Sequence, residues 1–212
     1  MRRLLIILFT VFTLASEARD TLFVQQPQWP ILIERHDNVL LLMRIDAQES
    51  RKLERFSINL DGVSLSEIKS VKLYYGGTDA RQDYPHRRMA PVDYITHFTP
   101  GKTLSAIPSY SVLKDQVQPQ RNTVRLTANQ SLFPGYNFFW VSIEMQSHAA
   151  LHTTLTARLQ EAVADGRTLP IQSVGPEKVL RRMGIGVRHA GDDGVAAYRI
   201  PGLVTTRRGT LL

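Results

Sequence analysis

The stretch "TVRLTANQSLFPGYNFFWVSIEMQ", residues 123–146, carries the clearest supersecondary pattern in the chain. Pro134-Gly135 predicts a turn between two strands. In the second strand the side chains alternate between two faces, with Phe139, Val141, Ile143 and Met145 on one and Trp140, Ser142 and Glu144 on the other. This period of two is that of a β-strand. The stretch therefore predicts a hairpin with one face in an apolar core.

Further short strands are predicted on both sides of this hairpin. They cover residues 21–26, 31–35, 38–47, 55–62, 71–77 and 153–166. The last segment could also be helical, because "TARLQEAVA" contains good helix formers, but the Asp165-Gly166 turn and the surrounding pattern favour a strand. Ser64 and Glu67 resemble a capping box, which predicts one helical turn over 64–70.

Many short strands and few helices predict an all-β fold. We expect a β-sandwich over residues 19–172, followed by a linker over 173–184. The composition then shifts, and residues 185–212 resemble the beginning of a second domain.

The N-terminal sequence "MRRLLIILFTVFTLASEA", residues 1–18, has the features of a signal peptide. A basic start precedes an apolar run that is too short to span a membrane, and Ser16 and Ala18 have the spacing of a cleavage site. A buried N-terminal helix is the alternative. We expect export to the periplasm, the cell surface or the medium, with no membrane span after cleavage. The chain has no cysteine, which excludes disulfides and a lipoprotein anchor.

The chain is basic, with 26 Lys and Arg against 19 Asp and Glu and a formal charge of +7. Such a balance can indicate nucleic-acid binding, but the signal peptide and the scattered basic residues argue against that partner. A basic surface suits an anionic glycan or simple solubility. The six histidines lack ligand spacing, so we expect no metal and no cofactor.

The stretch "RRMGIGVRHAGDDGVAAYRIPGLVTT", residues 181–206, resembles the Arg-Ile-Pro segment of bacterial sialidases (exo-α-neuraminidases, glycoside hydrolase family 33) of the Bacteroides and Tannerella group. The resemblance extends back through "LFPGYNFFWVSIEM" (132–145) and "PILIERHDNVLLLMRIDA" (30–47). It implies a carbohydrate-binding-module-like β-sandwich followed by a six-bladed propeller, of which residues 185–212 would be the first strand only. The implied activity is retaining hydrolysis of terminal α-linked sialic acids from glycoproteins, glycolipids (gangliosides included) and oligosaccharides.

The resemblance also implies roles for single residues. Arg199, with Ile200 and Pro201 of the motif, would bind the sialic acid carboxylate, for which the planar guanidinium is well suited. An ion pair of Arg199 with Asp192 or Asp193 is the alternative reading. In the family the general acid Asp and the Tyr nucleophile with its Glu follow this motif at positions beyond Leu212. No catalytic residue is therefore assigned, and we expect the 212-residue chain to be inactive alone.

In the sandwich itself, exposed aromatic residues would contact sugars. Tyr75, Tyr84 and Tyr94 fall outside the apparent core pattern, as do Trp29 and Tyr110, and Arg87 adds positive charge suited to an acidic sugar. The alternative is that these aromatics are packed. We expect sialylated glycans as partners, and nothing in the residues bears on oligomeric state. A stand-alone glycan-binding module or a non-catalytic spacer is the alternative function.

Overall fold

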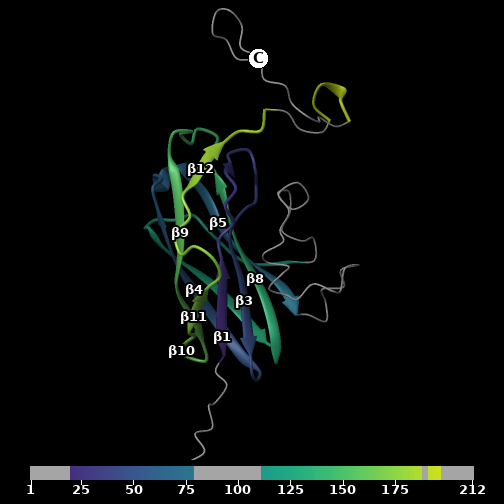
Figure 1. The fold of residues 1–212 in the computed structure, drawn as a ribbon, viewed down its shortest axis with the longest axis vertical. Coiled ribbons are helices and arrows are strands. Elements are labelled where there is room, and N and C mark those ends of the chain that lie inside the picture. Colours follow the sequence, from purple (N-terminus) through teal and green to yellow (C-terminus); the bar gives the residue numbers. More distant parts are fainter. Residues whose placement is uncertain (1–19, 79–110, 188–190, 197–212) are drawn as a thin grey trace, which may run out of the picture.

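The fold is a two-layer β-sandwich (Figure 1). The computed structural model describes residues 20–78, 111–187 and 191–196. The first sheet has the order β11-β1-β3-β8-β5-β6, and the second has the order β2-β12-β9-β4-β7 with β10 beside β9. Within the described ranges the regular structure is strands and two short 3-10 turns, as the all-β prediction requires.

The strands of the first sheet are β1 (Thr21–Gln25), β3 (Asn38–Ala47), β5 (Ile68–Thr78), β6 (Val112–Val117), β8 (Gly135–Met145) and β11 (Ile171–Ser173). Those of the second are β2 (Ile31–Leu32), β4 (Arg51–Asp61), β7 (Thr123–Leu132), β9 (Thr154–Ala164), β10 (Arg167–Thr168) and β12 (Arg181–Gly184). The 3-10 turns are η1 (Leu65–Glu67) and η3 (Asp192–Gly194).

The core lies between the two sheets, and β8 contributes the face that its alternation predicts. The side chains of Phe139, Val141, Ile143 and Met145 all belong to the main buried cluster. The ring of Phe139 meets the ring of Phe56 from β4 edge to face, with 5.4 Å between the centroids. This aromatic contact joins the two layers.

Both predicted turns are present, and each uses a left-handed backbone. Gly135 has φ of 96° between β7 and β8, while Asp165 and Gly166 have φ of 46° and 70° between β9 and β10. Asp and Gly tolerate such angles better than other residues, which is why Asp-Gly favours tight hairpins. Residues 154–164 form the strand β9, so the strand interpretation of this segment is confirmed and the helical alternative is wrong.

The predicted helical turn exists as η1, but its predicted capping box is wrong. Ser64 makes no side-chain cap hydrogen bond. Its Oγ instead lies 2.8 Å from the Oγ of Ser66, and Glu67 Oε1 accepts a hydrogen bond from the Ala150 amide at 2.9 Å. The Glu67 carboxylate thus binds the amide of Ala150, a residue distant in the sequence, instead of capping the helical turn.

The predicted linker over 173–184 is also wrong, because both its ends belong to the sandwich. Ser173 closes β11, which pairs in parallel with β1, and β12 pairs with β9 and β2. Arg181 of β12 is 2% exposed and donates to the carbonyls of Trp29 and Val39 at 2.9 and 2.6 Å. A buried arginine in a four-residue strand gives no apolar pattern, so the strand is not visible locally.

The predicted signal peptide (1–18) lies outside the described residues, as does most of the expected propeller strand over 185–212. In the described part of the chain, no helix has the length and apolarity needed to cross a membrane.

Candidate functional site

Most of the site residues predicted from the sequence lie outside the described residues: Arg199, Ile200, Pro201, Tyr84, Arg87, Tyr94 and Tyr110. Tyr75 is described, and its prediction as a sugar-contacting aromatic is wrong. Its side chain is 6% exposed, its ring centroid lies 4.9 Å from that of Phe139, and its hydroxyl donates to Asn137 Oδ1 at 3.3 Å. Tyr75 faces the core, while its neighbour Tyr74 lies on the outer face.

The outer face of the first sheet carries an unusual number of buried groups. Trp29, partly buried, packs with Tyr74 and Tyr136 against a small cluster of Val39, Leu42, Phe138 and Trp140. Beside this cluster, Glu144 contacts Lys69 Nζ at 2.8 Å, His36 Nδ1 at 2.9 Å and Lys72 Nζ at 3.1 Å.

These contacts set the charge state of Glu144. Burial alone would raise the pKa of this carboxyl, but hydrogen bonds from Lys69, His36 and Lys72 outweigh burial and hold the pKa at about 2. The charges of this cluster are therefore paired with one another, and the cluster stabilises the fold. Among the described residues, no group of three or more His, Asp or Glu has the arrangement of a metal site.

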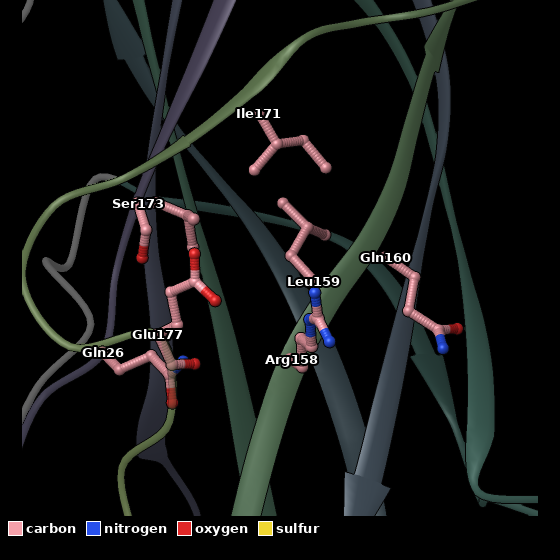
Figure 2. Close-up of a pocket in the computed structure, with 8 residues that line it drawn as sticks. Gln26, Arg158, Leu159, Gln160, Ile171, Ser173 and Glu177 are labelled. Carbon is pink, nitrogen blue, oxygen red and sulfur yellow. The ribbon is translucent and has the colours of Figure 1, made fainter.

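An open cleft of about 410 Å³ lies on the other sheet, where β9 faces the edge of the first sheet (Figure 2). We name it the β9 cleft, and its lining residues are Val24, Gln26, Arg158, Leu159, Gln160, Ile171, Ser173 and Glu177. In Figure 2, Gln26, Ser173 and Glu177 gather on one side, and Arg158, Leu159 and Gln160 come from β9 on the other. Leu159 and Ile171 point toward one another across the apolar floor.

The cleft exists because the neighbours of β9 on this side are short. On this edge of β9, β12 pairs only with Thr154 and Leu155 at one end, and β10 pairs only with Val163 and Ala164 at the other. The middle of β9 lies between these two short strands, and the cleft opens beside it. On its other side, β9 pairs with β4 with a register shift: Leu159 is opposite Ile58 and Glu161 is opposite Ser57, which leaves Gln160 as a bulge residue. Bulges redirect side chains and are frequent beside binding sites.

The chemistry of the β9 cleft is that of a polar ligand site. A guanidinium, two amides, a hydroxyl and a carboxylate surround an apolar floor, and Gln26 Nε2 donates to the Glu177 carbonyl at 2.6 Å. The side chain of Arg158 has no hydrogen bond or ion pair with any residue in the described ranges. Such a lining can bind sugar hydroxyls or a carboxylate.

Sequence reasoning missed every polar residue of this cleft. The alternation of the predicted strand over 153–166 does place Arg158 and Gln160 on one face. However, the opposite wall comes from segments far apart in the chain, since Gln26 and Glu177 are 151 positions apart. No local pattern signals that pairing.

Comparisons with known proteins agree with the fold. The family described as the N-terminal domain of BNR-repeat neuraminidase matches residues 19–168. A protein named sialidase from Bacteroides fragilis (strain YCH46) is 50% identical over 213 residues, which cover 98% of this chain and 39% of the relative. The solved structure of Hadza microbial sialidase Hz136 matches with a TM-score of 0.69 and 42% identity, over 89% of this chain and 36% of that chain.

This chain spans about two-fifths of the length of these relatives. The family match covers well over half of the 212 residues and includes every strand of the sandwich except β11 and β12. The chain therefore belongs to the family of N-terminal domains of BNR-repeat neuraminidases.

Proposed function

We propose that this chain is the N-terminal part of a secreted exo-α-sialidase. The whole protein would hydrolyse terminal α-linked sialic acids from glycoproteins, glycolipids and oligosaccharides. The observation that carries the proposal is the 50% identity to a protein named sialidase across 98% of this chain. The Arg-Ile-Pro motif at 199–201, within that span, supports it.

In this proposal Arg199 binds the carboxylate of sialic acid through its planar fork of donors. The retaining mechanism with a Tyr nucleophile, which the resemblance implies, requires groups that no residue of the 212 supplies. The 212-residue chain thus provides one substrate contact and the preceding domain, and it is inactive alone.

The DNA beyond codon 212 tests this assignment. We expect a reading frame that continues into Ser-x-Asp-x-Gly-x-x-Trp repeats (Asp boxes), which the resemblance to bacterial sialidases implies. We also expect a longer product that releases the fluorophore from a fluorogenic sialoside. Replacing Arg199→Ala in that product should lower kcat/KM at least a hundredfold. A longer product that leaves sialosides intact contradicts the proposal, and turnover by the purified 212-residue chain contradicts its inactivity.

We also propose that the sandwich binds a sialylated glycan in the β9 cleft. The guanidinium of Arg158, which has no partner among the described residues, suits the sugar carboxylate, and the Glu177 carboxylate and the amides suit hydroxyl groups. On a glycan array, the 212-residue chain should bind to the spots that carry sialylated glycans. The variant Arg158→Gln should bind these spots more weakly, whereas Arg167→Gln on β10 should bind them as the wild type does. If the chain binds to no glycan on the array, the result favours the alternative function, that of a non-catalytic spacer domain.

Export through a cleaved signal peptide completes the proposal. The composition of residues 1–18 supports it, and the family match begins at residue 19. Mass spectrometry of the protein from a bacterial periplasm should find a chain starting at Arg19. A product that retains Met1 and stays in the cytoplasm contradicts it.

A further inference from the structure

A second cleft of about 410 Å³ lies at the opposite side of the second sheet. We name it the β7 cleft, and its lining residues are Val117, Gln118, Pro119, Gln120, Arg121, Thr123, Val124 and Arg125. The strand β4 pairs with β7 on one side and with β9 on the other. The two clefts therefore flank β4 in the same sheet.

The outer face of the sheet between the clefts is polar throughout its central rows. Asn59 of β4 lies opposite Thr123 of β7 and Arg158 of β9. In the neighbouring row of the same face, two positions along β4, Ser57 lies opposite Arg125 and Glu161. Strand spacing puts β7 and β9 about 10 Å apart across β4.

A side-chain hydrogen bond joins the two clefts directly. Thr123 lines the β7 cleft and Gln160 lines the β9 cleft, and Thr123 Oγ1 donates to Gln160 Oε1 at 3.5 Å. This bond reaches from β7 to β9 over β4. One side chain from each lining thus meets the other above the sheet, and we treat the two linings with the polar rows between them as one surface.

On this surface, the positive charges outnumber the negative charges that are available to pair with them. The two acidic groups nearest to β4 have partners: Glu161 Oε2 lies 3.3 Å from Ser57 Oγ and 3.6 Å from Arg55 Nη2, and Asp61 Oδ1 accepts from Asn122. A third acidic group, Glu177, lies on the far wall of the β9 cleft. By contrast, the side chains of Arg121, Arg125 and Arg158 share no hydrogen bond or ion pair with a residue that the structure describes.

We propose that this surface, from Arg158 in the β9 cleft across Asn59 to Arg121 and Arg125 in the β7 cleft, binds one extended glycan that carries two or more anionic groups. The inference rests on the proposed glycan binding and adds the second cleft and the multiple charge. Arginine forks bind carboxylate and sulfate groups alike. Once one charged sugar binds at Arg158, contacts at the β7 cleft become intramolecular, which increases affinity without new elements of structure.

Calorimetry with the 212-residue chain tests the proposal. The probes are the methyl glycoside of sialic acid, a linear tetramer of α-linked sialic acids, a sulfated heparin tetrasaccharide, a neutral galactose tetramer and a single-stranded DNA oligomer of matched charge. The sialic acid tetramer should bind at least tenfold more tightly than the methyl glycoside, and added salt should weaken it. The neutral tetramer should show no comparable gain.

Variants locate the contacts. The double change Arg121→Gln and Arg125→Gln should weaken tetramer binding about fivefold to tenfold and leave the methyl glycoside unaffected. Arg158→Gln should weaken both ligands. Arg167→Gln, an exposed arginine on β10 outside both clefts, is the matched control and should change neither. Unchanged unfolding midpoints will show that all variants are folded.

Each outcome has a distinct meaning. A tetramer that binds no more tightly than the methyl glycoside, or that ignores the β7 cleft variants, overturns the extended surface while leaving the β9 cleft proposal intact. Failure of every anionic glycan to bind overturns both. Tighter binding of the sulfated tetrasaccharide, lost in the same variants, supports the surface and makes its ligand a sulfated glycan. Equal binding of the DNA oligomer overturns a glycan ligand.

Discussion

The two sheets of this sandwich use their outward-facing charges differently. On the first sheet the charges are buried and paired: Lys72 and Glu144 lie 3.1 Å apart, and each side chain is 9% exposed. Arg44, 5% exposed, lies 4.5 Å from the ring centroids of both Phe23 and Tyr136. On the second sheet, the guanidinium groups of the two clefts are exposed and lack such partners among the described residues.

The difference separates charges that hold the fold from charges that are available to a ligand. A charge removed from water needs a partner, because its desolvation is otherwise costly. An exposed cation remains hydrated, contributes little to folding, and can exchange its water for an anionic group. The first outer face is therefore expected to govern stability, and the second is expected to govern binding.

Removing one charge from the paired face should have the largest effect on stability. Glu144→Gln keeps the shape but removes the carboxylate nearest to the buried Lys72, which retains only Asp37 at 3.5 Å and the His36 carbonyl. The free energy of unfolding should therefore fall by about 3 kcal/mol in urea titration. The matched control is Glu177→Gln in the β9 cleft, with an expected change below about 0.5 kcal/mol. Equal losses in the two variants would remove the distinction between the faces.

The contribution of Glu144 should also disappear in acid. Its pKa is lowered from 4.5 to about 2, so the folded state binds this proton more weakly than the unfolded state. The stabilisation is fully present above about pH 4.5 and is lost as the pH falls toward 2. Urea titrations at several pH values should show the wild type approaching Glu144→Gln over this interval. A gap that stays constant from neutral pH to pH 2.5 is the contradicting result.

The close packing of the first outer face can be tested at Gly76. A Cβ placed there would lie 2.7 Å from Nε1 of Trp140, whose side chain is 1% exposed and cannot move freely. Gly76→Ala should therefore cost about 2 kcal/mol of stability by urea unfolding. For comparison, a Cβ at Gly184 would lie 3.4 Å from Leu32 Cδ2, at the end of a side chain, and 4.0 Å from the Ile31 carbonyl oxygen, so Gly184→Ala should be nearly neutral. Neutral behaviour at Gly76 would show that the face is loosely packed.

The smallest effect on stability is expected on the second outer face. Arg125→Gln and Arg158→Gln should each change the unfolding free energy by less than about 0.5 kcal/mol, because both side chains are exposed. The same variants should lower glycan affinity in calorimetry. A loss of more than about 1 kcal/mol in either variant would mean that these arginines have a structural role.

Local patterns predicted the parts of the fold that depend on near neighbours. The strand β3 matches the segment predicted over 38–47, and Asp165-Gly166 forms the expected turn. Local patterns did not predict burial where a residue far away in the sequence determines it. The sequence pattern predicts that Tyr75 lies outside the core, but in β5 its side chain belongs to the main buried cluster.

The candidate site was less predictable than the fold. Strand alternation places Arg158 outward, but it does not show that Gln26 and Glu177 form the opposite wall of a cleft. Nor does it show that Thr123 and Gln160 meet across β4. Both contacts arise from pairing between segments separated by many residues.

The sequence by itself determined the all-β class, the inward face of β8 and the family, because alternation and characteristic motifs are properties of contiguous residues. Only the tertiary structure decided that β12 completes the second sheet through the buried Arg181, and that two clefts flank β4. The physical reason is that hydrogen-bonded pairing and burial join residues far apart in the chain. The sequence alone therefore does not distinguish a buried arginine that donates hydrogen bonds, such as Arg181, from an exposed arginine, such as Arg158.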